Sequence, residues 1–246
     1  MKKQIYLTPA AGKRLIAKAL ANNEKILRIA REHTLVITSG TTDAYVGDEI
    51  FKALGLPDFD MTTLYAGVFM GPDGIKKASH RDLVIRKGEY LPEYDIAKIA
   101  PELTKEDMIL KGGNALYLRD RQVGVSIGNP EFGKLAPICA AVYGKRVQLL
   151  MPIGLEKRIE CPVTVAERFV NDPENTGLRL AYAPGEPYTE LDVFEDMGLH
   201  AMLLSAGGVG GYEGGVIIGL EGPEEAMKRA DELVSAVKDE PRYGLR

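Results

Sequence analysis

Cysteine and histidine are scarce in this sequence of 246 residues, which has two cysteines, Cys139 and Cys161. These two lack the spacing of a metal site and the density of the disulfide framework that holds small secreted proteins together. The three histidines, His33, His80 and His200, are isolated from cysteines and from repeated acids that could serve as metal ligands. The sequence therefore predicts no metal site and no cofactor, and it is typical of a protein of the reducing cytoplasm.

A strong charge of either sign is also missing, because 35 acidic and 31 basic side chains leave a formal net charge of -4. The basic residues are scattered, so the sequence as a whole offers no electrostatic field for nucleic acid. No apolar run is long enough to cross a bilayer, and the basic start reaches Arg14 before any hydrophobic segment long enough for export. We therefore expect no nucleic-acid partner and no membrane partner.

Helical and extended segments alternate along the first part of the chain. Two helices precede a buried strand over residues 34–38, and Asn22-Asn23 can cap the second of them. A further helix begins at residue 41 and ends at Gly55. Further strands are expected over residues 62–70, 82–91, 107–116, 122–128 and 146–154, with a helix over 134–144. This alternation predicts an α/β fold with a mainly parallel, Rossmann-like sheet flanked by helices on both faces.

The composition changes around residues 171–187, where Asn, Asp, Gly and Pro break regular elements and mark a junction. We place a domain boundary near residue 160, which gives an α/β domain over 1–160 and a smaller domain over 161–246. Strands over 178–183, 200–206 and 214–222 and helices over 188–198 and 223–239 are expected in the smaller domain. Their order predicts a small α+β unit, ferredoxin-like in style.

The turn Ser39-Gly40-Thr41-Thr42 is the first candidate site. A glycine lets the chain turn sharply after a buried strand, and the free amides and dipole at the start of the next helix favour an anion. Thr41 and Thr42 add hydroxyl groups, while Ser39 can orient the loop or donate to a phosphate oxygen. The same hydroxyls can equally cap the helix without binding any ligand.

Two later loops are expected at the same edge of the sheet, where α/β folds gather their ligands. The loop "NPEFGK" over residues 129–134 follows a strand and brings Lys134 to the start of a helix. The loop "MPIGLEKR" over residues 151–158 brings Glu156 and Lys157 to the end of another strand. The first can be a simple connector and the second a surface turn, so both interpretations stay open.

A family resemblance adds to the interpretation of the first turn. The stretch "ITSGTTDAYVGDEI" resembles the Gly-Thr-Thr loop of the sugar-phosphate-sensing domains of DeoR-type regulators and the Gly-Ser-Thr loop of ribose-5-phosphate isomerase. Both belong to a superfamily that includes glucosamine-6-phosphate deaminases and CoA transferases. A second stretch, "ILKGGNALYLRDRQVGV", is similar to the isomerase segment "KGGGGALLREK", with Lys111 and Asp120 at the corresponding spacing.

The resemblance implies a role for each residue of the second stretch. Lys111 would stabilise an enediolate, and Asp120 would move a proton between adjacent sugar carbons. Such chemistry needs a carboxylate that reaches the C–H bond and a cation that offsets the charge on oxygen. We add Gly112, Gly113 and Asn114, which lie in the matched segment, as ligand-binding candidates.

The chain departs from the isomerase pattern at two places. Asp120 is one methylene shorter than the glutamate of the family, and Arg86-Lys87 stand where the family has an acidic "GADE" segment. The sequence therefore predicts a cytoplasmic protein that binds a small phosphorylated metabolite, sugar-phosphate-like, with isomerase-type proton transfer if it is an enzyme. A noncatalytic metabolite sensor or assembly module is the alternative, and a homo-oligomer is compatible with either.

Overall fold

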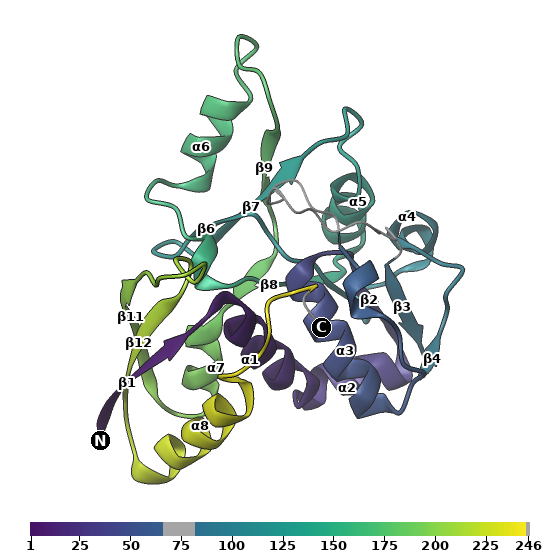
Figure 1. Cartoon of the computed structure of the whole chain (residues 1–246). Coiled ribbons are helices and arrows are strands. Elements are labelled where there is room, and N and C mark those ends of the chain that lie inside the picture. The colour runs from purple at the N-terminus through teal and green to yellow at the C-terminus, as the bar shows by residue number, and fades with distance from the viewer. Residues whose placement is uncertain (66–81, 245–246) are drawn as a thin grey trace.

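The computed structural model describes residues 1–65 and 82–244, which combine α-helices with three β-sheets (Figure 1). Its helices are α1 (Pro9–Ala21), α2 (Glu24–Glu32), α3 (Thr41–Leu54), α4 (Ile96–Ile99), α5 (Leu135–Lys145), α6 (Val163–Val170), α7 (Glu190–Asp196) and α8 (Glu224–Val237). Short 3-10 helices are η1 (Met61–Thr63), η2 (Ala100–Glu102) and η3 (Leu155–Lys157). The strands are β1 (Lys2–Leu7), β2 (Thr34–Ile37), β3 (Leu83–Arg86), β4 (Glu89–Tyr90), β5 (Met108–Leu110), β6 (Ala115–Tyr117), β7 (Gln122–Ile127), β8 (Gln148–Pro152), β9 (Arg179–Ala183), β10 (Glu186–Tyr188), β11 (His200–Ala206) and β12 (Val216–Glu221).

The largest sheet has the strand order β10-β8-β5-β2-β3-β4. The strands β10, β8, β5 and β2 run parallel to one another, whereas β3 pairs antiparallel with β2 and β4 pairs antiparallel with β3. The predicted α/β class is therefore confirmed, but the sheet is mixed. The antiparallel pairing of β4 with β3 arises at Lys87 and Gly88, whose φ angles of 51° and 82° make a two-residue turn that folds the predicted strand 82–91 into a hairpin.

Strand pairing crosses the boundary that we placed near residue 160. The sheet β1-β12-β11 joins the start of the chain to its end, and the sheet β6-β7-β9 joins β9 to two earlier strands. Even the largest sheet takes its edge strand β10 from the later part of the chain. The Pro/Gly-rich stretch 171–187 thus connects strands of two sheets, and the ranges 1–160 and 161–246 share all three sheets.

The helix ends agree with the signals in the sequence. Thr8 caps α1 by accepting a hydrogen bond from the Ala11 amide at 3.1 Å, with Pro9 in the first turn, and Asn23 caps α2. Helix α3 ends at Gly55, whose φ of 67° lies in the left-handed region that favours glycine. The predicted strand 62–70 begins instead within η1, and its residues from 66 onward lie outside the described residues, as does His80.

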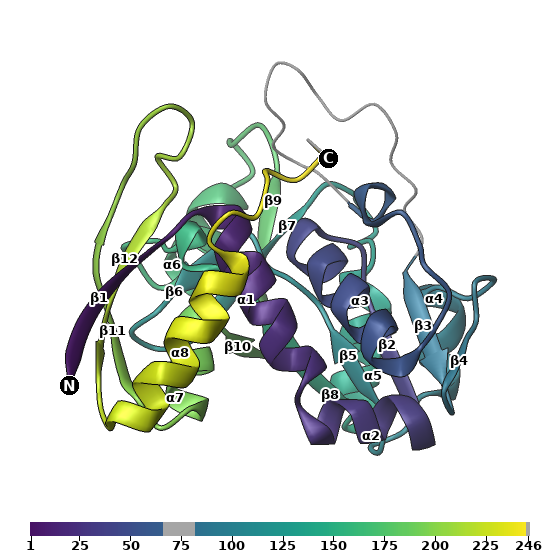
Figure 2. The same ribbon diagram turned by 60° about the horizontal axis from the view of Figure 1, so that its bottom comes forward.

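Helix α1 joins the sheets through the hydrophobic core. It packs against α3 on the side of the largest sheet and against α7 and α8 on the side of the β1-β12-β11 sheet, as Figure 2 shows. Buried side chains from both sides, such as Leu15 of α1, Ile37 of β2 and Phe194 of α7, belong to one continuous cluster. In the described part of the chain, none of the helices has both the length and the apolar character needed to traverse a bilayer.

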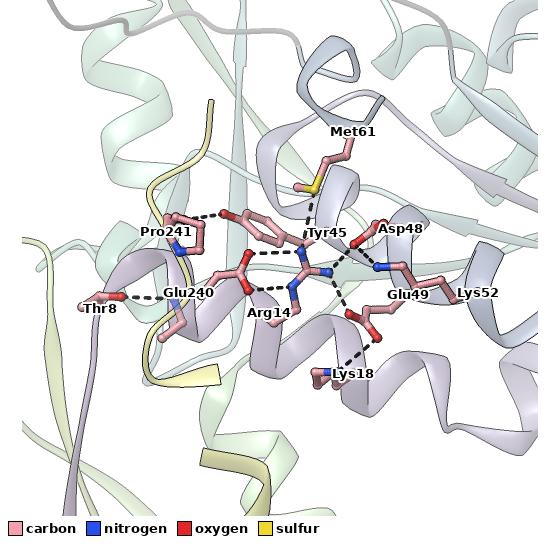
Figure 3. A network of polar contacts seen from close by, with 11 residues as sticks. Thr8, Arg14, Lys18, Tyr45, Asp48, Glu49, Lys52, Met61, Glu240 and Pro241 are labelled. Carbon is pink, nitrogen blue, oxygen red and sulfur yellow. Dashed lines mark hydrogen bonds and ion pairs between the residues drawn. The ribbon is translucent and has the colours of Figure 1, made fainter. Parts of the chain in front are cut away.

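A buried arginine fixes the end of the chain onto α1 and α3 (Figure 3). The Arg14 guanidinium lies 2.5 Å from Asp48, 2.8 Å from Glu49 and 3.1 Å from Glu240, measured between nitrogen and oxygen. It also stacks over the Tyr45 ring, 4.7 Å from the ring centroid. This Arg14 cluster, formed by the five residues named, ties α1 and α3 to the segment that follows α8.

Candidate functional site

A cavity of about 440 Å³ opens where the parallel strands β2, β5 and β8 end. Loops that follow these strands and β7 surround it, because the carboxyl ends of parallel strands meet at one edge of a sheet. The lining residues are Ser39, Gly40, Thr41, Thr42, Asp43, Lys111, Gly112, Gly113, Asn114, Val125, Ser126, Ile127, Gly128, Asn129, Phe132, Gly133, Lys134, Leu135 and Lys157. Helix α3 begins at this cavity with Thr41.

The cavity brings the two sequence-predicted loops together. Ser39, Gly40, Thr41 and Thr42 line it beside Lys111, Gly112, Gly113 and Asn114. Asp120 is not in the lining, because strands β6 and β7 form a hairpin with Tyr117 paired to Gln122, and Asp120 lies exposed in its turn. The structure therefore gathers eight predicted residues and leaves the predicted proton acceptor outside.

The hydroxyls of the Ser39–Thr42 loop do not cap α3. Gly40 occupies the N-cap position, and among residues 1–65 and 82–244 no side chain accepts a capping hydrogen bond there. The Thr42 hydroxyl oxygen is buried and has no hydrogen-bond partner among the described residues. The first-turn amides of α3 thus receive no side-chain cap, which is the condition under which a helix start attracts an anion.

Gly40 is required for space and not for its backbone conformation. Its φ of 174° is extended, so any residue could adopt it. A Cβ atom at this position would lie 2.8 Å from Asp43 Oδ2, and one at Gly112 would lie 3.4 Å from the same oxygen. Gly40 therefore leaves room for the Asp43 carboxyl group, whereas a Cβ atom at Gly112 would make only an ordinary van der Waals contact with it.

Asp43 is a cavity residue that sequence reasoning missed. Its side chain is buried, and Oδ2 accepts hydrogen bonds from the Gly112 amide at 2.9 Å and the Thr38 hydroxyl at 3.3 Å. Oδ1 has no partner in the part of the chain that the structure describes. Burial raises the pKa of Asp43 to about 6, against the opposing charges of Lys111 and Lys157. Its place at the start of α3, next to the Gly-Thr-Thr turn, was the available signal.

Three lysines bring positive charge to the cavity. Lys111 donates to the carbonyl oxygen of Gly112 at 3.4 Å. Lys157 donates to the carbonyl oxygen of Gly113 at 2.7 Å. Burial lowers the pKa of both lysines, while Asp43 raises the pKa of each. Lys111 and Lys157 thus both lie near the Asp43 carboxyl group.

The third lysine supports the Ser39–Thr42 loop directly. Lys134 donates to the Ser39 hydroxyl at 2.6 Å and pairs with Asp82 at 2.5 Å. Asp82 in turn accepts from the Ser39 amide at 2.9 Å. Lys134 and Lys157 were outside our predicted set, although the sequence placed both in loops after strand ends.

A second group of charges lies behind Lys157. Glu156 forms an ion pair with Lys13 at 2.8 Å. Burial tends to raise the pKa of Glu156, but the positive charges of Lys13 and Lys157 outweigh this effect and hold the pKa below its usual value. Glu190 accepts from the Leu155 amide at 3.0 Å, and burial raises its pKa to about 8. These contacts fix η3, and with it the position of Lys157.

The arrangement suits an anion more than a metal ion. Among residues 1–65 and 82–244, no group of three or more His, Cys, Asp or Glu side chains could hold a metal. The described lining residues supply ammonium groups, hydroxyls and a helix start, and Asp43 is the one acidic side chain among these described residues. Comparisons of the chain with protein-family models, curated proteins and solved structures give no match.

Proposed function

We propose that the protein binds a small phosphorylated metabolite in this cavity, with the phosphate group at the start of α3. The observation that carries the proposal is the convergence of Lys111, Lys134 and Lys157 on a helix start. There the buried Thr42 hydroxyl has no partner among the described residues. An anion would satisfy the hydroxyl and the first-turn amides and would offset the lysine charges together.

The balance of charge supports an anionic ligand. Asp82 offsets Lys134 through their ion pair, and Glu156 pairs with Lys13 and also acts on Lys157. The described residues thus set four lysines, which include Lys111, against Asp43, Asp82 and Glu156, while burial raises the pKa of Glu190 to about 8 and favours its neutral form. The cavity therefore holds an excess of positive charge when Asp43 is ionised. A phosphate group placed between Lys111 and Lys157 would remove that excess.

The rest of the lining supports a sugar-like body for the ligand. Asn114 and Ser126 offer polar groups, while Val125 and Ile127 add apolar surface. Phe132, in the same lining, adds a ring that is more than a third exposed. The volume falls within the range of small-molecule sites, about 300–1,000 Å³. The resemblance to sugar-phosphate-binding loops and a Rossmann-like interpretation of the parallel strands favour the same class of ligand.

Binding is the part of the proposal that the geometry supports best. Isomerase-type proton transfer, with Lys111 as the stabilising cation, is the chemistry that the resemblance adds. The exposed position of Asp120 in the β6–β7 turn favours a noncatalytic sensor instead, because a carboxyl group outside the lining reaches no substrate carbon there. Turnover assays with pentose and hexose phosphates separate the two functions.

Replacing Thr42 with valine tests the phosphate site, because it removes the hydroxyl and keeps the shape of the side chain. A hydrogen bond to a charged group contributes about 1.5–3 kcal/mol, so we expect affinity for a bound sugar phosphate to fall by roughly tenfold or more. Isothermal titration calorimetry measures the change. Thr164→Val, at an exposed threonine of α6, is the matched control and should bind as the parent does. Equal affinities of the Thr42→Val variant and the parent would remove Thr42 from the site.

A further inference from the structure

Asp43 places a carboxyl group where the proposed anion would bind. Resting on the proposed function, we propose that Asp43 takes up a proton when a dianion enters the cavity and donates it from Oδ1 as a hydrogen bond to that anion.

The hydrogen bonds of Asp43 identify the oxygen that carries the proton. Oδ2 accepts from the Gly112 amide and from the Thr38 hydroxyl, so its lone pairs are already engaged. Oδ1 is buried, has no partner among the described residues and belongs to a side chain that lines the cavity. A proton on Oδ1 leaves both existing bonds intact and turns that oxygen into a donor.

The surrounding charges explain why binding drives the protonation. Lys111 after β5 and Lys157 in η3 stabilise the ionised carboxylate in the free protein, and Lys134 with Asp82 forms the neighbouring pair at Ser39. A dianion would engage the same ammonium groups and would add negative charge beside the carboxylate. Both changes disfavour the ionised form of Asp43.

The direction of the pH dependence follows from this linkage. Burial already raises the pKa of Asp43 to about 6 in the free protein, and the bound dianion raises it further. Above about pH 6 the free protein loses the proton that the complex retains, so binding must take it back from solvent. Affinity therefore falls as pH rises, by up to roughly tenfold for each pH unit between the free and bound pKa values.

Calorimetric titration with sulfate measures the proton directly, because sulfate remains a dianion near neutral pH and takes up no proton itself. Titrations at pH 7 in two buffers with different ionisation enthalpies give the number of protons absorbed. We expect close to one proton per sulfate for the parent and none for Asp43→Asn. The control Asp120→Asn removes an exposed carboxyl group outside the cavity and should behave as the parent.

The outcomes separate this proposal from the anion site itself. Sulfate binding by the parent without proton uptake overturns the role of Asp43 and leaves the anion site standing. Proton uptake that persists in Asp43→Asn also overturns the role of Asp43. It would assign the proton to another group, such as Lys111 or Lys157, whose pKa values are lowered by burial. Absence of any sulfate binding by the parent overturns this proposal, whereas the proposed function fails only if sugar phosphates also do not bind.

Infrared difference spectroscopy on the parent covers the case in which Asp43→Asn does not fold. Addition of sulfate should produce the band of a protonated carboxyl group, with loss of carboxylate absorption. A difference spectrum with no such band at saturating sulfate would contradict protonation of Asp43 without reference to any variant.

Discussion

Replacing Arg14 with methionine is expected to lower the free energy of unfolding by about 3–5 kcal/mol. The guanidinium pairs with Asp48, Glu49 and Glu240 in a site where its side chain is almost fully enclosed. Methionine fills a similar volume but removes the buried cation that the three carboxylates share, while Lys52 and Lys18 contact Asp48 and Glu49 only from more exposed positions. Removing one partner of a buried ion pair is the costly way to break it. Urea denaturation measures the change.

Two further variants test whether charge is the cause. Lys18→Met removes a cation that contacts Glu49 at 3.4 Å from a more exposed position, so the expected loss is about 1 kcal/mol or less. Adding Glu240→Gln to Arg14→Met should recover part of the lost stability, because it removes one of the three neighbouring carboxylates that repel one another without the arginine. A loss below about 1 kcal/mol for Arg14→Met would show that the carboxylates find water or other partners, as surface pairs do.

The Arg14 cluster also connects the end of the chain to the cavity. The Arg14 guanidinium contacts the Met61 sulfur (Figure 3). Near the end of the chain, Tyr243 donates to the Met61 carbonyl at 2.6 Å. Three residues further along, the Leu64 carbonyl accepts from the Gly40 amide at 3.3 Å. Loss of the cluster should therefore loosen η1 before it affects the strands of the largest sheet.

Replacing Lys111 with methionine should weaken binding of a sugar phosphate by at least about thirtyfold. Truncation of one partner of a buried charged contact typically removes about 2–5 kcal/mol of binding free energy. In this variant Asp43 also loses the first of the two cations that favour its ionised form, so its pKa should rise further. Calorimetry at about pH 7 gives the affinity, and circular dichroism confirms that the variant is folded.

Lys25→Met is the matched control for Lys111→Met, because Lys25 is exposed on α2 and is not a lining residue. It changes the net charge of the protein by the same amount. Its affinity should stay within about twofold of the parent, since charges separated by more than a Debye length of about 10 Å are screened by salt. A similar loss in both variants would assign the effect to overall charge and not to the cavity.

Local signals in the sequence were sufficient for the parts of the fold that depend on neighbouring residues. Thr8 and Pro9 start α1, and Gly55 ends α3, because caps and left-handed turns involve only a few adjacent residues. The pairing of Ser39–Thr42 with Lys111–Asn114 came from the family resemblance and not from local signals, because the sequence placed residues 111–114 inside a strand over 107–116, whereas β5 ends at Leu110.

Long-range pairing could not be predicted in the same way. The pairing of β1 with β12 joins residues at opposite ends of the sequence, and no nearby residue encodes it. Asp120 had the spacing of the isomerase segment, but the β6–β7 hairpin uses that spacing to make an exposed turn. The roles of Asp43 and Lys134 depend on contacts with Gly112 and Asp82, which only the folded sheet brings close.

The most direct test of the phosphate site is a calorimetric titration of the parent protein with a panel of pentose and hexose phosphates, each paired with its free sugar. Three lysines and an uncapped helix start predict that at least one phosphorylated member binds about a hundredfold or more tightly than its free sugar, since each charged hydrogen bond adds about 1.5–3 kcal/mol. Equal affinity within every pair, or no binding by any phosphorylated member, would contradict the account.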